Sequence, residues 1–170
     1  PSCDPACSCG RFVEIWNLVF TQFNRKDAGI LEPLPQKNID TGMGLERLAA
    51  VMQSVPNNFE TDLFAPLIKE IKARLSGYQA AMSPEVYAVA DHIRAITFAI
   101  YDGILPSNEG RGYVVRKVIR KSVLHLRQLG IEKPFLYKLV AVVAQIMKEP
   151  YPELTGRREN IAEIILSEEK

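Results

Sequence analysis

The spacing of apolar residues gives the first part of the chain the pattern of a β-strand. Residues 11–25 are rich in aromatic and β-branched side chains and poor in helix formers, which predicts a strand there. Apolar residues fall on both faces of this segment, with Val13, Ile15 and Val19 on one and Phe12, Trp16, Leu18 and Phe20 on the other. We therefore expect a central strand that is covered on both sides.

A hairpin and a short helix are expected next. Residues 24–29 are polar and end in glycine, which favours a turn, and residues 32–35 (EPLP) are locally extended because each proline biases its predecessor away from the helical region. Residues 37–40 are predicted to be the returning strand. Thr41 is then placed to cap a helix over residues 45–53, where apolar residues recur at helical spacing.

Beyond Pro56 the alternation disappears and helical spacing follows, so we place a domain boundary near residue 55. This divides the chain into residues 1–55 and residues 56–170. Helices are predicted over residues 61–75, 84–101, 112–129, 134–148 and 156–169. The expected fold class is α+β, with a short antiparallel β-hairpin and one helix followed by an all-α domain.

Composition narrows the choice of classes. A chain of 170 residues that is 47% hydrophobic and 24% charged fits one ordinary globular domain or two small ones and excludes disorder. Its 21 basic and 20 acidic residues give a net charge of +1, so a nucleic-acid partner would have to be met by a local patch. The apolar stretches are far shorter than the roughly 20 residues of a membrane span. The first residues do not resemble a secretory signal, and the absence of an initial Met suggests an excised piece.

The three cysteines all lie in the first nine residues, as Cys3, Cys7 and Cys9. Their spacing could supply thiolates to a metal, but structural zinc takes four ligands, and neither His92 nor His125 is near in sequence. We therefore favour reduced cysteines in a cytoplasmic protein and assign no metal site.

The turn before the first helix has features of an anion site. Gly42 and Gly44 would let the backbone approach a ligand closely at a helix N-terminus, where amide dipoles favour anions. Arg47 could direct a bidentate guanidinium at a phosphate, and Asp40 could hold a substrate ammonium group. The alternatives are a tight turn that needs glycine and an ion pair of Arg47 with a neighbouring glutamate.

The segment from Arg111 to Ile131 is a long basic run without acidic residues. The stripe expected to face inward consists of Val115, Val118, Ile119, Ser122, Leu126 and Leu129. The basic residues form two ridges, one of Arg116, Arg120 and Arg127 and one of Lys117 and Lys121. Acidic residues normally intersperse a merely solvated face, so we interpret these ridges as a site for nucleic-acid phosphates.

Two sets of motifs resemble one protein family. Residues 14–20 (EIWNLVF), followed by a proline-containing hairpin and by residues 38–47 (NIDTGMGLER), are similar to the end of the catalytic domain of the alanyl-tRNA synthetases. The second of these pieces resembles motif 3 of the class II aminoacyl-tRNA synthetases. Residues 90–95 (ADHIRA) and 102–114 (DGILPSNEGRGYV) resemble the helical tRNA-recognition region of the same enzymes. The motifs occur in the same order as in these enzymes, and together they extend the resemblance over nearly the whole chain from Arg11 onward.

The resemblance implies ligation of alanine to tRNA(Ala) through an alanyl-adenylate, with ATP and Mg²⁺. The implied ATP-binding residues are Gly42, Gly44 and Arg47. The implied alanine-binding residues are Asn17, Val19 and Asp40. Among these, Arg47 and Asp40 are the expected catalytic residues.

For the RNA, the resemblance implies that Asn108 reads the G·U wobble pair of the acceptor stem. An amide suits the shallow minor groove, which is the readable groove of A-form RNA, although an asparagine can also simply form an Asx-turn. The implied tRNA-binding residues are Asn108, Arg111, Arg116, Lys117, Arg120 and Lys121. No DNA and no membrane partner is expected.

Motifs 1 and 2 of the class II enzymes and the zinc-binding histidines of the editing domain do not occur in this sequence. We therefore expect zinc only in the absent editing domain, and we expect the chain to be an inactive fragment, because half a site cannot position and stabilise the transition state. One alternative is a free-standing RNA-binding helical module without ligase activity, which the complete DTGMGLER sequence disfavours. Another is a protein-interaction scaffold, which the acid-free helix disfavours.

Overall fold

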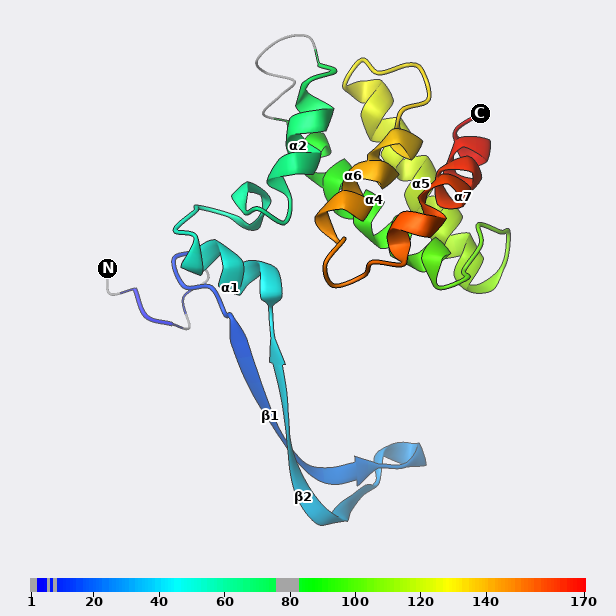
Figure 1. Cartoon of the computed structure of the whole chain (residues 1–170). Coiled ribbons are helices and arrows are strands. Elements are labelled where there is room, and N and C mark those ends of the chain that lie inside the picture. Colours follow the sequence, from blue (N-terminus) through cyan, green and yellow to red (C-terminus); the bar gives the residue numbers. More distant parts are fainter. Residues whose placement is uncertain (1–2, 6, 8, 76–82) are drawn as a thin grey trace. The chain divides into compact units, whose positions relative to one another are not determined.

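The computed structural model describes residues 3–5, 7, 9–75 and 83–170. The chain divides into two compact units, Pro1–Asn58 and Phe59–Lys170. The first contains an antiparallel hairpin and one helix, and the second is helical (Figure 1). The expected α+β class, a hairpin followed by a helical domain, is confirmed.

In the first unit, strand β1 (Trp16–Arg25) pairs with strand β2 (Leu31–Met43). The connecting turn is closed by a hydrogen bond from the Lys26 amide to the Ile30 carbonyl, and it contains a residue with positive φ, Gly29 at 78°. The register shifts between Thr21 and Phe23, where β2 contains its two prolines. Proline has no amide hydrogen to donate, so the ladder is interrupted there.

Three expectations for the hairpin are corrected. β1 begins at Trp16 rather than at residue 11, and β2 is longer than residues 37–40. Thr41 does not cap a helix, because β2 continues to Met43 opposite Trp16 and helix α1 (Leu45–Met52) begins only after Gly44. The Thr41 hydroxyl instead accepts a hydrogen bond from the Trp16 indole and donates one to a backbone carbonyl of β1.

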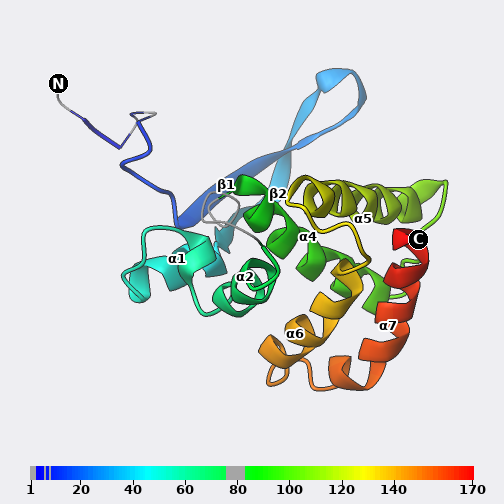
Figure 2. The same ribbon diagram turned by 90° about the horizontal axis from the view of Figure 1, so that it is seen from above.

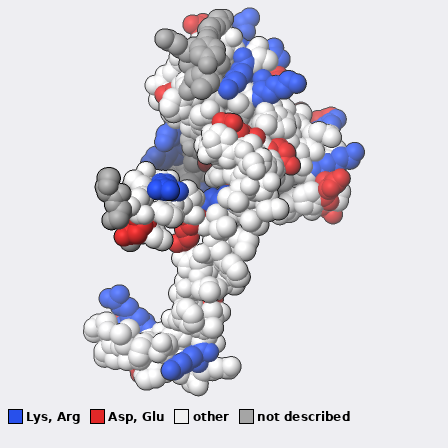
Figure 3. Space-filling view, turned by 90° about the vertical axis from the view of Figure 1, so that its left-hand side faces the viewer, with Lys and Arg blue, Asp and Glu red and all other residues white. Residues whose placement is uncertain are grey.

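The expectation that β1 is a covered central strand is wrong for the part of the chain that is described. Its sheet has two strands, so β1 has a single neighbour. Trp16 is 57% and Phe20 65% exposed, and Ala50 is the one buried apolar residue of this unit among the described residues. In Figure 3 the stem of the hairpin is almost free of charged side chains. The apolar pattern on both faces therefore lacks a cover from these residues.

In the described part of the second unit, the helices pack around α4 (Pro84–Tyr101), which contacts each of the other α-helices described there (Figure 2). The others are α2 (Ala65–Lys72), α5 (Gly110–Gln128), α6 (Leu139–Ile146) and α7 (Leu154–Glu169). Short 3₁₀ turns occupy Asn58–Glu60 and Leu136–Lys138. Residues of α4 that are completely buried are Val86, Val89, Ala90, Ile93 and Thr97.

Each of the predicted helices has a counterpart in the structure, but the observed ends of most of them differ from the predicted ones. Helix α4 has the expected bounds, with Pro84 in its first turn and the Ser83 hydroxyl accepting from the Glu85 amide. Helix α2 begins later than expected because residues 61–64 form a turn that Ala65 closes onto the Thr61 carbonyl. The expected helix over 134–148 is divided between a 3₁₀ turn and α6. Among the helices of the described chain, we find none with the length and apolar character needed to cross a bilayer.

Candidate functional site

The register of the hairpin brings four predicted site residues to one face. Val19 lies directly opposite Asp40, and Asn17 lies directly opposite Gly42. Cross-strand partners, and residues two apart on one strand, share a face of a sheet. The Gly44 amide donates to the Ile15 carbonyl at 3.0 Å, so this face ends where the chain enters α1.

The face offers groups of different chemistry. One carboxylate oxygen of Asp40 accepts from the Thr41 amide at 2.8 Å, and the Asn17 amide nitrogen donates to the Glu14 carboxylate at 3.4 Å. A Cβ atom added at Gly42 would meet no atom within 4 Å, so any side chain there would occupy open space beside Asp40. A carboxylate, an amide, a branched apolar side chain and a glycine gap suit a small ligand with a positive end.

Arg47 lies at the same end of the hairpin. Its guanidinium donates to the backbone carbonyl of Glu14 at 2.6 Å. A Cβ atom at Gly44 would lie 3.4 to 3.5 Å from the Arg47 side chain, in ordinary van der Waals contact, so the arginine stem packs beside this glycine. A guanidinium carries five N–H donors, and this contact uses one of them. Arg47 thus links α1 to the segment before β1 and retains donors for an anion.

In the second unit, the structure brings Asn108 and Arg116 together. Arg116 Nη1 donates to Asn108 Oδ1 at 2.6 Å. Because a guanidinium only donates, the carboxamide oxygen must face it, and the amide nitrogen of Asn108 is directed elsewhere. Asn108 is exposed, so that nitrogen is presented as a donor at the surface.

Arg116 is itself held by α7. Its Nε and Nη2 donate to the two carboxylate oxygens of Glu168 at 2.9 and 2.7 Å, a bidentate pair. The Glu168 carboxylate raises the pKa of the Arg116 guanidinium, which is charged at any relevant pH. Sequence reasoning counted Arg116 among the ridge cations, but the structure engages it between Glu168 and Asn108. No local signal could reveal this, because Glu168 lies 52 residues away.

The loop that carries Asn108 is fastened at both sides. The Ser107 hydroxyl donates to the Glu109 carbonyl at 2.8 Å, and the Ser107 amide donates to the Gly112 carbonyl at 3.1 Å. A Cβ atom at Gly112 would lie only 2.3 Å from the Leu105 carbonyl oxygen and from Ser107 Oγ. The close approach of loop and helix therefore requires glycine at this position.

The remaining predicted cations are on the surface of α5. Those that are exposed are Arg111, Lys117, Arg120 and Lys121. A depression of about 400 Å³ is lined by Arg116, Arg120 and Arg127, together with Glu168. The inward stripe is also observed, with Val115, Ile119, Ser122 and Leu126 buried and Val118 and Leu129 packed against the core. Helix α5 thus separates an apolar face from a basic one.

The side chain of His92 connects two helices of the second unit. Its Nδ1 lies 3.0 Å from Ser122 Oγ, and that hydroxyl donates to the Val118 carbonyl, so the ring nitrogen is the donor to Ser122. Burial lowers the pKa of His92, and Lys121 and His125 lower it further, while Asp91 opposes them. The ring joins α4 to α5 as a neutral group.

Sequence reasoning also missed Glu169. This residue is 7% exposed, and its carboxylate accepts from the backbone amides of Phe135, Leu136 and Tyr137 at 2.8 to 3.0 Å. These amides begin the 3₁₀ turn before α6, so the end of α7 supplies the cap that this turn lacks locally. The neighbouring residues Glu168 and Glu169 therefore hold two different elements, Glu168 the Arg116 side chain of α5 and Glu169 the 3₁₀ turn before α6.

Comparison with known proteins gives a consistent result. The model of the family described as "tRNA synthetases class II (A)" matches residues 2–170. A protein named alanine–tRNA ligase from Pediococcus pentosaceus is 56% identical over 163 residues, which cover 94% of this chain and 18% of that protein. Proteins of the same name from Halorhodospira halophila and Geobacillus thermodenitrificans are 54% and 49% identical over 94% and 100% of this chain. The chain spans about a fifth of the length of these relatives.

Proposed function

The chain belongs to the class II (A) tRNA synthetases, and on that premise we propose that it is part of an alanine–tRNA ligase. The proposed activity of the whole protein is activation of alanine with ATP and Mg²⁺ to alanyl-adenylate, followed by transfer to tRNA(Ala). In this proposal, the first unit contributes one wall of the adenylation site and the second unit binds the acceptor stem. The supporting observation is the register that gathers Asn17, Val19, Asp40 and Gly42 on one face.

The alanine end of the site is formed by β1 and β2. Asp40 binds the α-ammonium group through its carboxylate, which the Thr41 amide orients. Val19, directly opposite, is the wall that excludes larger side chains, and Asn17 contributes hydrogen bonds at the polar end. Such a wall rejects amino acids larger than alanine more effectively than it rejects glycine. The loss of one methyl or methylene group weakens binding by only about 1–3 kcal/mol.

The nucleotide end is formed by the turn into α1. Arg47 contacts ATP with the donors that its bond to Glu14 leaves, and the absence of a Cβ at Gly42 and Gly44 keeps the approach open. ATP bound here would supply the adenylyl group, with pyrophosphate as the leaving group, and Mg²⁺ would offset the charge of its phosphates. The role of Arg47 is to hold the nucleotide in place while the carboxylate of alanine attacks.

RNA recognition is assigned to the second unit. Asn108 presents its amide nitrogen to acceptors in the minor groove at the G·U pair, and Arg116 fixes the amide in that orientation. Arg111, Lys117, Arg120 and Lys121 contact phosphates of the acceptor stem, a contact that salt weakens. Arg116 contributes orientation and local charge in addition.

A chimera tests the ligase proposal. The 170 residues replace the matching segment of the Pediococcus pentosaceus enzyme, and alanine-dependent ATP–pyrophosphate exchange is measured. We expect activity to be retained, and Asp40→Asn in the chimera to lower kcat/KM for alanine roughly 10- to 100-fold, the value of a hydrogen bond to a charged group. Glu32→Gln is the matched control, since this carboxylate is on the same strand but pairs with Lys26 at the hairpin turn.

Two results would contradict the proposal. One is a folded chimera without exchange activity, which would favour a helical RNA-binding module. The other is equal kcat/KM for alanine in the Asp40→Asn and Glu32→Gln variants, which would remove Asp40 from the alanine site. The isolated chain is expected to show no exchange, and robust exchange by it would overturn its assignment as one part of the site.

A further inference from the structure

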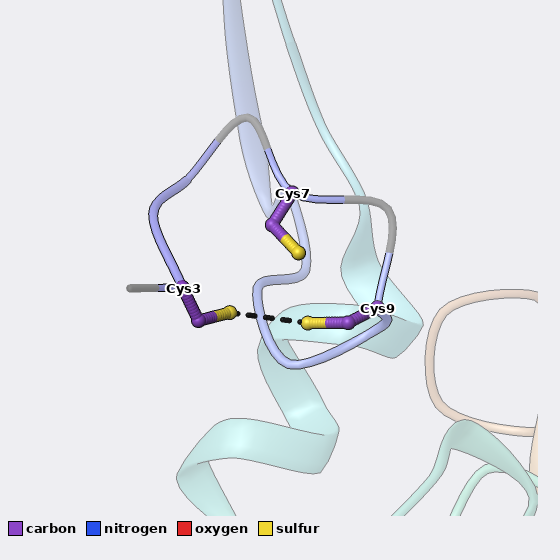
Figure 4. A group of neighbouring side chains, drawn as sticks. All are labelled: Cys3, Cys7 and Cys9. Atoms are coloured by element: carbon purple, nitrogen blue, oxygen red, sulfur yellow. Dashed lines mark hydrogen bonds between the residues drawn. The ribbon is translucent and has the colours of Figure 1, made fainter. Parts of the chain in front are cut away.

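The three cysteine thiols converge on one point (Figure 4). Their sulfur atoms all lie within 4.8 Å of one another, and Cys3 Sγ is 3.1 Å from Cys9 Sγ. Sulfur atoms on a tetrahedral zinc ion lie about 3.8 Å apart when the Zn–S bonds are about 2.3 Å. The three thiols therefore need only small side-chain rotations to reach a common ion.

The backbone creates this convergence. The Cys7 amide donates to the Asp4 carbonyl at 3.0 Å and closes a turn between the first two cysteines. Gly10 has φ of 78°, a conformation that favours glycine, and the Arg11 amide next to it donates to the Cys9 sulfur. Amide donors to sulfur are the type of outer contact that orients metal ligands.

Apolar packing does not explain the cluster. Cys9 is exposed, Cys3 is half-buried, and all three cysteines are free thiols. The buried apolar core of the described residues lies in the second unit, apart from Ala50. Hydrogen bonds between thiols are weak, so they contribute little to holding three sulfur atoms together.

We propose that Cys3, Cys7 and Cys9 form a zinc site in which three thiolates bind one Zn²⁺ ion. Each thiol loses its proton on binding, and zinc prefers thiolate ligands in tetrahedral geometry. No His, Asp or Glu of the described residues joins this group within the same distance, so water or a ligand from elsewhere takes the fourth position. The site is separate from the alanine, ATP and RNA sites proposed above.

The site would have a structural role. Glu14 and Ile15 follow the last cysteine closely, and their carbonyls accept the hydrogen bonds from Arg47 and from the Gly44 amide. A metal bound by the cysteines fixes the segment that leads into β1 and so supports those contacts. Among the described residues from Cys3 to Ile15, no side chain is buried that could do the same.

Cobalt substitution tests the proposal on the full 170-residue chain. The protein is reduced with a phosphine, freed of metal and titrated with Co²⁺. We expect sulfur-to-cobalt charge-transfer bands and intense visible bands that saturate at one equivalent and disappear when one equivalent of Zn²⁺ is added. In parallel, Zn²⁺ should slow alkylation of all three thiols, measured by mass spectrometry.

Two variants make the assignment specific. The combined Cys3→Ser, Cys7→Ser and Cys9→Ser variant should lose the bands completely and keep its helical circular dichroism, because these side chains lie outside the helical core. His125→Gln is the matched control that removes an imidazole near His92 and should leave the bands unchanged. Absence of charge-transfer bands in the wild type, saturation at more than one equivalent, or bands that persist in the triple variant would overturn the proposal.

Discussion

Asn108 is oriented by a chain of contacts between side chains far apart in the sequence. Glu168 holds Arg116 through two hydrogen bonds, and Arg116 holds the Asn108 carbonyl oxygen. The sequence indicated Asn108 and Arg116 as separate candidates, because a polar loop and a basic helix can be recognised locally. Their mutual contact could not be predicted, since it depends on the packing of α7 against α5.

The first residue-scale prediction concerns Glu168. Glu168→Gln should leave Arg116 with a weaker partner and release the Asn108 amide, lowering the preference for a G·U over a G·C acceptor minihelix about threefold to tenfold, the value of one hydrogen bond. Fluorescence anisotropy titrations measure this preference. Glu163→Gln, an exposed change of the same kind on the same helix, is the control. Equal preferences in the two variants would remove Glu168 from recognition.

The second concerns His92. Burial lowers its pKa below the ordinary value of 6.5, so the unfolded chain takes up a proton first as the pH falls. Protonation of His92 therefore lowers the free energy of unfolding progressively as the pH falls below about 6.5, and it has no such effect above that pH. Urea unfolding between about pH 7 and pH 5 should show a steeper loss of stability in the wild type than in His92→Gln. Parallel curves would contradict a His92 that is neutral and half-buried in the folded state.

At the scale of elements, the helical unit depends on joints that local propensity does not encode. Helix α4 was predictable to its ends from its apolar spacing, Pro84 and the Ser83 cap. The 3₁₀ turn that precedes α6 was not, because the carboxylate that binds its amides belongs to Glu169, more than thirty residues later. The register of the hairpin likewise depends on where β2 ends, which the sequence placed too early.

The Glu169 cap gives a stability prediction. Glu169→Ala removes three hydrogen bonds to a charged acceptor and leaves buried amides without partners, and it should lower the free energy of unfolding by about 3 kcal/mol. Glu163→Ala serves as the exposed control on α7 and should change it little. Urea denaturation followed by circular dichroism compares the two. A loss no larger for Glu169→Ala than for the control would contradict the capping role.

The contact between the Asn108 loop and α5 gives a second prediction at the scale of elements. Gly112→Ala places a Cβ atom 2.3 Å from the Leu105 carbonyl oxygen, so the loop must move and Asn108 with it. The G·U preference of the minihelix should fall while the helical content is kept. Gly156→Ala is the matched control, because nothing lies within 4 Å of a Cβ atom there. A Gly112→Ala variant with full preference would show that the loop position is not decisive.

At the scale of the whole molecule, the two units differ in how many apolar residues they bury. The second unit holds almost all of the buried apolar residues in the described chain, and the first holds Ala50. The sequence predicted both the hairpin and the helices, but not that the apolar faces of β1 would lack a cover here, because a pattern shows that a face is apolar and not which segment covers it.

The most direct measurement is a titration of this chain with an acceptor minihelix of tRNA(Ala), beside one whose G·U pair is changed to G·C, at two salt concentrations. The proposal predicts tighter binding of the G·U form at both concentrations, loss of this difference in Asn108→Ala, and weaker binding of both RNAs at higher salt. Equal affinities of the wild type for the two RNAs at both salt concentrations would contradict the assignment of G·U recognition to the Asn108 loop.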